Sequence, residues 1–409
     1  MIIGGMADMA ILKTISKWLG IIICIGGGSG SLSAFFLTSL SFVTAVREAN
    51  SWLIFCLPLA GVLFTWLYLR FGGNASRGNN LIIDQANGGE ESIPWQMLPL
   101  TLFGTLTTHL FGGSVGREGT AVQMGGTMAE YVGKLWHIEE RHRYLLMICG
   151  ISGGFSAVFG TPIAGTIFSL EVLAIGKLST KGLIPSLMTA LLANFVTTFF
   201  GVEHRRYEMG SIPHTNLKLI GLICAFAIIF GLTSRLFSRG IAKLKQLYRQ
   251  LFPNPFWRAA IGSGVVLLLV FLYQSTRYLG LSLPLLTDAF NGEQLPFDFL
   301  NKLLFTVFSL GAGFQGGEVT PLFEIGATLG STLAQMSALP VSFVAALGFV
   351  GVFAGATNTP LACFIMGIEL FGSEGAAWLL IVCVISYLCS GGEGIYSAQL
   401  KGKKVTVLS

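Results

Sequence analysis

One acidic residue interrupts a long apolar part of the chain: Glu118, within the Gly-Arg-Glu-Gly-Thr sequence at 116–120. Apolar segments lie before it at 95–111 and after it at 121–128. An ionisable side chain at membrane depth is costly and is usually buried in protein or faces water. A helix beginning here, after a glycine break, would present free backbone N–H groups. We therefore predict an anion site in which the Glu118 carboxylate competes with a bound anion.

A second copy of this pattern follows 200 positions later, at 316–321. At this offset, Glu318 aligns with Glu118 and Thr320 aligns with Thr120. An internal repeat with interrupted hydrophobic segments at matching positions is typical of transporters whose site lies between the repeats. The sequence therefore predicts that both acidic segments meet at one site.

A second pair of segments supports this internal repeat. Residues 150–173 align with 348–371 at an offset of 198, which places Thr-Pro on Thr-Pro and Glu171 on Glu369. We expect a first repeat at 18–201 and a second at 216–400. The whole chain, 1–409, is then one transmembrane domain without a soluble regulatory domain.

The composition is that of an integral membrane protein. The 409 residues are 53% hydrophobic and only 11% charged, against about 25% charged residues in soluble domains. The net charge of +5 favours contact with lipid headgroups over nucleic acid. The seven cysteines show no CxxC spacing and are interpreted as small buried hydrophobic residues. No metal site and no cofactor is predicted.

Long apolar segments predict a succession of membrane helices. They lie at 18–46, 52–71, 95–111, 120–135, 144–159, 162–175, 183–200, 217–241, 261–273, 321–336, 341–355, 360–371 and 376–388.

Four other segments connect or follow these helices. Residues 72–89 form either a loop or a re-entrant half-helix, since their apolar part is too short to span. Residues 281–298 are expected to be a polar connection. The basic segment 235–258 is expected to be a cytoplasmic loop. The lysines at 401, 403 and 404 suggest a cytoplasmic C-terminus.

Four motifs together resemble the CLC family of anion transporters. They are Gly-Arg-Glu-Gly at 116–119, Gly-Thr-Pro-Ile-Ala-Gly-Thr-Ile-Phe-Ser-Leu-Glu at 160–171, Gly-Glu-Val-Thr-Pro at 317–321 and Tyr-Ser-Ala at 396–398. The resemblance covers essentially the whole chain. It implies an all-α membrane protein, a CLC-type inverted-repeat bundle of tilted and broken helices. It also implies a homodimer and a location in the cell membrane.

Departures from the chloride-type motifs resemble the fluoride/proton antiporter subgroup of this family. Residues 78–82 read Gly-Asn-Asn-Leu-Ile where chloride-type members have Gly-Ser-Gly-Ile-Pro. Thr120 replaces a proline, and Glu318 adds an acid to the second-half motif. Val172 stands where chloride/proton exchangers carry an internal glutamate. The resemblance therefore implies export of fluoride in exchange for protons.

The resemblance assigns gating to Glu118, which when ionised occupies the anion site and when protonated leaves it carrying a proton. The alternative is a structural ion pair with Arg117, which we do not favour because helical neighbours point in different directions. Glu318 could carry protons in place of the missing internal glutamate. Alternatively, it is a structural acid that accepts backbone N–H bonds.

Three polar side chains are candidates for anion binding. Thr320 offers a hydroxyl donor or is a helix N-cap, and Tyr396 offers a hydroxyl donor or is an interfacial aromatic. Asn79 offers an amide donor or is a turn residue. Other anion-binding candidates, taken from the two core motifs, are Gly116, Gly119, Thr120 and Val319.

Three classes of function remain to be compared. A proton-coupled fluoride antiporter is favoured over a passive anion channel, because two acids lie in the predicted path. A chloride/proton antiporter is kept as an alternative. An intramembrane enzyme is disfavoured, since HExxH does not occur in the sequence. The lone His109 is interpreted as a packed core residue.

Overall fold

The structure, a computed structural model, describes residues 2–401 and the side chains from residue 12 onward. Of the C-terminal lysines, those at 403 and 404 lie outside the described residues. The described chain is α-helical and contains no β-strand, only two isolated bridges. The α-helices are α1 (Ile2–Ala49), α2 (Leu57–Leu67), α3 (Asn79–Ala86), α4 (Met97–Leu110), α5 (Glu118–Leu135), α6 (Arg143–Phe159), α7 (Pro162–Glu171), α8 (Leu183–Phe199), α9 (Leu217–Leu251), α10 (Pro255–Tyr273), α11 (Pro284–Asn291), α12 (Asp298–Ala312), α13 (Val319–Ser337), α14 (Val341–Thr357), α15 (Pro360–Phe371) and α16 (Ala376–Cys389).

Four helical segments are long and apolar enough to cross a membrane. They are Leu12–Ala49, Ser51–Ala86, Leu217–Leu251 and Pro255–Tyr273. The second combines α2 and α3 with short 3-10 and π segments. Most remaining helices are too short to span about 30 Å at 1.5 Å per residue. Two of them, α5 and α13, begin at buried residues, as expected of broken helices that are covered by protein.

Three predicted segments differ from the structure. Residues 72–89 contain the short, largely buried helix α3, which is the half-helix alternative. The expected loop at 235–258 is wrong, because α9 continues to Leu251; its leucines, lysines and glutamines all favour a helix. The expected polar connection at 281–298 is also wrong. It contains α11, which begins at Pro284 and ends at the left-handed Gly292.

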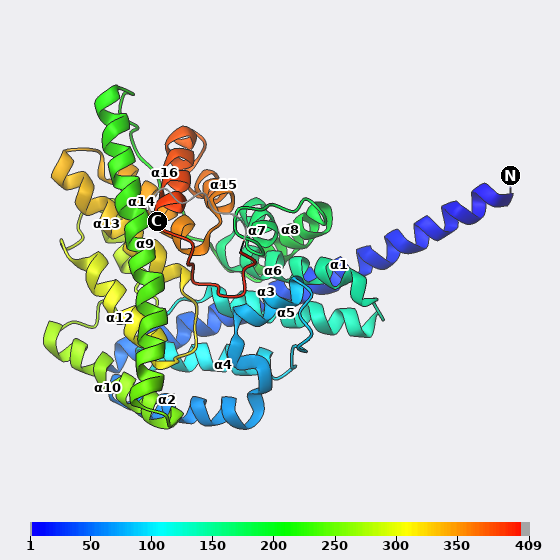
Figure 1. Ribbon diagram of the computed structural model, residues 1–409, viewed down its shortest axis with the longest axis horizontal. Coiled ribbons are helices and arrows are strands. Elements are labelled where there is room, and N and C mark those ends of the chain that lie inside the picture. Colours follow the sequence, from blue (N-terminus) through cyan, green and yellow to red (C-terminus); the bar gives the residue numbers. More distant parts are fainter. Residues whose placement is uncertain (1, 402–409) are drawn as a thin grey trace.

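Helices α5–α8 lie on one side of the molecule and α12–α16 on the other, whereas α2 lies beside α10 (Figure 1). Within each half, one helix pair packs backbone against backbone. A Cβ atom on Gly125 of α5 would overlap the carbonyl of Gly150 in α6, and one on Gly326 of α13 would overlap that of Gly348 in α14. Small residues at helix interfaces permit this close approach.

Two glutamates join the halves reciprocally, away from the acidic core motifs. Glu171, at the end of α7, accepts the N–H groups of Leu361 and Ala362 at the start of α15 (3.1 and 2.8 Å). Glu369, in α15, accepts those of Ile163 and Ala164 at the start of α7 (3.0 and 2.7 Å). Each carboxylate thus satisfies two free N–H groups at the positive end of the other helix.

Candidate anion site

A pair of backbone hydrogen bonds joins the starts of α5 and α13. Gly116 and Gly317 form an antiparallel bridge in which each N–H donates to the other carbonyl, at 2.6 and 2.8 Å. A side chain at Gly116 would lie 2.9 Å from both Pro321 and the Glu118 carboxylate, so glycine is required by the close approach. The prediction that the two motifs meet is confirmed.

The Glu118 carboxylate lies across this junction against the second half of the chain. Its side chain is 1% exposed. Oε2 accepts the backbone N–H of Thr320 at 3.0 Å, and Oε1 accepts a short hydrogen bond from the Thr320 hydroxyl. A carboxylate therefore occupies the N-terminal end of α13, where free N–H groups and the helix dipole favour a negative charge.

The expectation that Arg117 and Glu118 point apart is wrong. Arg117 Nε lies 3.5 Å from Glu118 Oε1. The spacing rule for helical neighbours does not apply, because Arg117 precedes the first residue of α5 and has φ −117°. The backbone N–H of Arg117 also donates to Glu118 Oε2, at 3.1 Å. The Glu118 carboxylate is thus held by the hydroxyl and N–H of Thr320 and by the N–H and guanidinium of Arg117.

The matching residues of the other half are arranged differently. Thr120 bonds with the hydroxyl of Thr105 at 2.6 Å, so its hydroxyl is already engaged. Glu318 precedes α13 as its N-cap residue and makes no side-chain cap hydrogen bond. The N-cap interpretation of Thr320 is therefore wrong, because Thr320 is the second residue of the helix and its hydroxyl binds Glu118.

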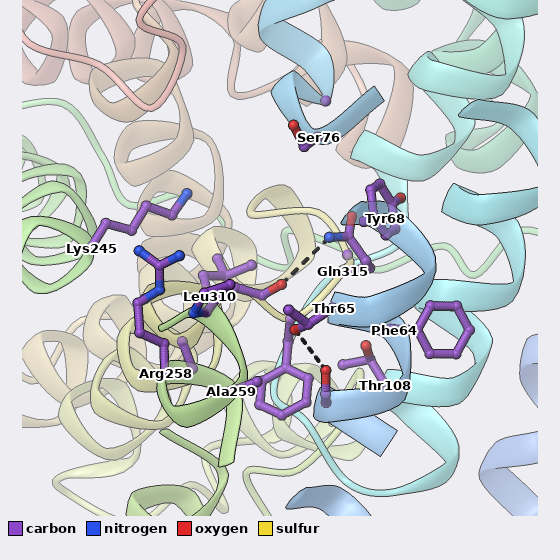
Figure 2. Close-up of a pocket in the computed structure, with 18 of the residues that line it drawn as sticks. Phe64, Thr65, Tyr68, Ser76, Thr108, Lys245, Arg258, Ala259, Leu310 and Gln315 are labelled. Atoms are coloured by element: carbon purple, nitrogen blue, oxygen red, sulfur yellow. Dashed lines mark hydrogen bonds between the residues drawn. The ribbon is translucent and has the colours of Figure 1, made fainter. Parts of the chain in front are cut away.

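Glu318 lines a cavity of about 340 Å³ on the other side of the junction. Two more predicted residues, Asn79 and Tyr396, line the same cavity. Figure 2 shows Lys245 and Arg258 on one side of this cavity and Tyr68 on the opposite side. The structure therefore separates the two acids: Glu118 is sealed at the junction, whereas Glu318 faces the cavity.

Four cations line this cavity. Arg77 is paired with Asp84 and Glu91, and the other three are Lys245 and Arg249 from the last turns of α9 and Arg258 from the first turn of α10. The sequence analysis places these three in a loop and misses their position at the site. Their spacing was the available signal, because Lys245 and Arg249 are four residues apart and so share one face of a helix. Together they give the cavity a positive lining that attracts anions.

The remaining predicted residues pack around the junction. The Asn79 amide is so close to the Gly119 Cα that a Cβ there would lie 2.7 Å from its Nδ2. Val319 is buried directly before Thr320. Tyr396 is also buried, with its ring 6.4 Å edge-on from Phe168, so the interfacial-aromatic interpretation is wrong.

His109 has the position predicted for a core residue. It is fully buried, and its Nδ1 lies 2.8 Å from the carbonyl oxygen of Thr105. The sequence motifs do not predict a further buried ion pair. It is formed by Lys302 of α12 and Glu324 of α13, which are 3.1 Å apart and both fully buried. The described residues contain no group of three or more metal-ligating side chains.

Comparison with known proteins gives consistent matches. Residues 60–391 match the family described as voltage gated chloride channel. A chloride/fluoride channel protein of Pseudomonas syringae pv. tomato is 43% identical over 97% of this chain and 89% of that protein. An H⁺/Cl⁻ exchange transporter ClcA of Vibrio vulnificus is 24% identical over 92% of this chain and 87% of that protein.

Solved structures share the fold. The crystal structure of a CLC-type fluoride/proton antiporter superposes with a TM-score of 0.92 at 36% identity, covering 96% of this chain and 99% of that one. A slow cyanobacterial Cl⁻/H⁺ antiporter superposes with a TM-score of 0.81 at 21% identity, covering 93% and 96%. The predicted all-α architecture of inverted repeats is therefore confirmed.

Proposed function

We propose that this chain, which belongs to the CLC (voltage gated chloride channel) family, exports fluoride in exchange for protons. Family membership makes it an integral membrane transport protein rather than an enzyme. The names of two similar proteins, a chloride/fluoride channel protein and a CLC-type fluoride/proton antiporter, support fluoride as the anion.

One observation carries this proposal: the Glu118 carboxylate occupies an anion-binding position. It takes the backbone N–H and the hydroxyl of Thr320 at the start of α13. A free anion would use the same donors once Glu118 left. Protonation removes the negative charge that holds the side chain there. In the proposed cycle, an anion enters as the protonated Glu118 swings away, and loss of the proton returns it.

Glu318 is the proposed proton carrier on the cavity side. Its carboxyl lines the water-accessible cavity, and Coulombic interactions couple it to Lys245 and to Glu118. Protons arriving through the cavity therefore have an acid at its inner end, close to the gate. Val172 is apolar and offers no carboxylate at the position where related exchangers carry one.

Selectivity for fluoride is proposed to come from dense hydrogen-bond donors. Fluoride is small and strongly hydrated, so the site must replace its water with donors. Thr320 and Asn79 lie around the junction, and Tyr396 lines the cavity beside Glu318. The backbone N–H groups of Gly119, Thr120 and Val319 are at the two helix starts and complete this donor set in the proposal.

The assembly and division of the chain are also proposals. The two repeats are placed at 18–201 and 216–400, with the junction of α5 and α13 between them. We propose a homodimer in the cell membrane, with lipid around its exposed apolar residues. Fluoride and protons are the proposed transported ions.

The test is ion flux through purified protein in liposomes. Fluoride efflux is followed with a fluoride electrode and proton uptake with an internal pH dye, while a parallel series uses chloride. The proposal predicts proton movement driven by a fluoride gradient and a much smaller response to chloride. Equal coupling to both anions would identify a chloride/proton antiporter. Anion flux without proton movement would identify a passive channel.

A further inference from the structure

The buried pair formed by Lys302 and Glu324 is not among the residues that line the cavity. Nζ of Lys302 is 3.1 Å from Oε2 of Glu324, and both side chains are fully buried. Glu324 lies four residues after Thr320 in α13, so it is one helical turn away on the same face. Thr320 is the residue that binds Glu118.

The two partners are held very differently. Lys302 donates to three oxygens besides the glutamate: the carbonyls of Tyr278 (3.3 Å) and Gly280 (3.0 Å) and the hydroxyl of Ser282 (2.6 Å). Within the described residues, no donor other than the Lys302 ammonium, at 3.1 Å, reaches the Glu324 carboxylate. Burying a carboxylate with so few hydrogen bonds is costly, so packing does not explain the acid. The positive charge of Lys302 opposite it does.

The charges around the junction form a balanced set. Arg117 and Lys302 are positive, and Glu118 and Glu324 are negative. Glu318 and Lys245, which are coupled to each other, add one charge of each sign. Coulombic interactions couple Glu324 with both Glu118 and Arg117. Protonation of Glu118 therefore leaves one uncompensated positive charge, which one monovalent anion neutralises. The site then holds one negative charge at a time, either the carboxylate or the anion.

We propose that Glu324 limits the anion site to a single negative charge by neutralising Lys302. The proposal deepens the proposed function, because exclusion of a second negative charge links anion entry to protonation of Glu118. Glu324 and Lys302 act through the site's charge and touch neither the carboxylate nor the anion. They are positioning residues, and their effect is expected in the pH profile of anion binding.

Other ionisable groups lie near this set. From the 201–216 linker, Tyr207 is coupled electrostatically to Glu324, and the exposed Arg205 is coupled to Arg117 and Tyr207. Helix α11 contributes Asp288, which is paired with Arg277 at 2.7 Å, and α14 carries no ionisable side chain. On the far side of Lys302 lie Arg47 and His109, both coupled to that lysine.

The test is calorimetric fluoride binding to E324Q across a pH series, in detergent. This change leaves Lys302 charged, because three oxygens still hold it. At an effective dielectric constant of about 20, one additional positive charge beside the site is expected to change the anion affinity about tenfold. At the low pH values at which Glu118 is protonated, E324Q is expected to bind fluoride about tenfold more tightly than the wild type. The pH at which affinity starts to fall is expected to move about one unit lower.

The double variant K302M/E324Q is expected to restore the wild-type affinity and pH profile. The matched control is E130Q, which leaves Arg143 and Lys134 without their acid at the other end of α5. It makes the same chemical change three turns from Glu118, so the fluoride profile is expected not to move. An unchanged profile in folded E324Q, or an equal shift in E130Q, would overturn the proposal.

The single variant K302M gives a second, independent readout. Glu324 then has neither a cation nor a hydrogen bond, so it is expected to take up a proton. The infrared spectrum should show a protonated-carboxyl C=O band that is absent from K302M/E324Q. Absence of this band would overturn the charge-balance role even if E324Q does not fold. If wild-type protein binds chloride and not fluoride, the fluoride assignment fails, and the same series with chloride tests the pair.

Discussion

The two halves of the chain meet at two places, and only one of them keeps the symmetry of the repeat. At α7 and α15, Glu171 and Glu369 exchange equivalent hydrogen bonds, each with two N–H groups of the opposite helix. At α5 and α13, Glu118 binds Thr320, but Glu318 does not bind Thr120 and faces the cavity instead.

This difference separates architecture from transport. A reciprocal pair of carboxylates at helix starts stabilises the contact between halves without distinguishing one side from the other. A gate must distinguish them, because an ion enters from one face and leaves from the other. The asymmetry at the core junction gives one sealed acid and one cavity-facing acid, which is the arrangement that the proposed proton exchange would use.

The largest effect is expected when the sealed acid, Glu118, is neutralised. We expect E118Q to fold and to lower proton-coupled exchange by about a hundredfold or more, the scale of losing an essential proton-transfer group. The amide cannot carry a proton or compete with an anion as a charge. Proton uptake driven by a fluoride gradient in liposomes measures this. An unchanged gradient-driven signal would reject the gating role.

The cavity-facing acid should have a smaller and more selective effect. We expect E318Q to slow proton movement about tenfold, while fluoride affinity changes less, because Glu318 makes no contact with the Glu118 carboxylate. E318A should in addition loosen the donors around Thr320. Calorimetry and proton flux on the same preparation separate these effects. Intact proton flux with weakened fluoride affinity would leave Glu318 as an architectural residue.

The reciprocal acids should affect stability and leave coupling unchanged. We expect E171Q to destabilise the protein by about 1–2 kcal/mol, because the amide loses one acceptor and the charge at the helix start. E369Q should have a smaller effect, since Glu369 is only partly buried. Thermal unfolding in detergent measures both. A loss of proton coupling in either folded variant would contradict the division between architecture and transport.

The smallest expected effect concerns the amide beside Gly119. We expect N79S to lower the ratio of fluoride to chloride transport by about fivefold, the scale of one hydrogen bond. The shorter serine hydroxyl leaves the junction with a less extended donor. Flux of the two anions in parallel liposome series gives the ratio. If the ratio does not move, Asn79 is only the first residue of α3.

The meeting of the two acidic motifs could be predicted because the repeat was visible in the residues themselves. An offset of 200 aligned Glu118 with Glu318, and glycines marked the breaks before both helices. The loss of symmetry could not be predicted in this way. It depends on Thr105, which lies outside the repeated motif and engages the Thr120 hydroxyl.

The charged residues around the site were harder to predict than the motif. Lys245 is predicted in a loop because cytoplasmic loops of membrane proteins are rich in lysine and arginine, whereas helix α9 continues through it and brings it to the cavity. Lys302 and Glu324 are 22 residues apart in sequence and only tertiary packing pairs them. Such pairs have no local pattern, since the partner of a buried charge can come from any neighbouring helix.

The bridge between Gly116 and Gly317 restricts which parts can move during transport. Its two backbone bonds, 2.6 and 2.8 Å long, would both break if the halves rocked apart at this point. The Gly125–Gly150 and Gly326–Gly348 contacts leave no free space for α5 or α13 to slide. A cycle that preserves these contacts must open by rotation of a few side chains. In such a cycle the Glu118 carboxylate and its neighbouring side chains move, and the surrounding helices keep their positions.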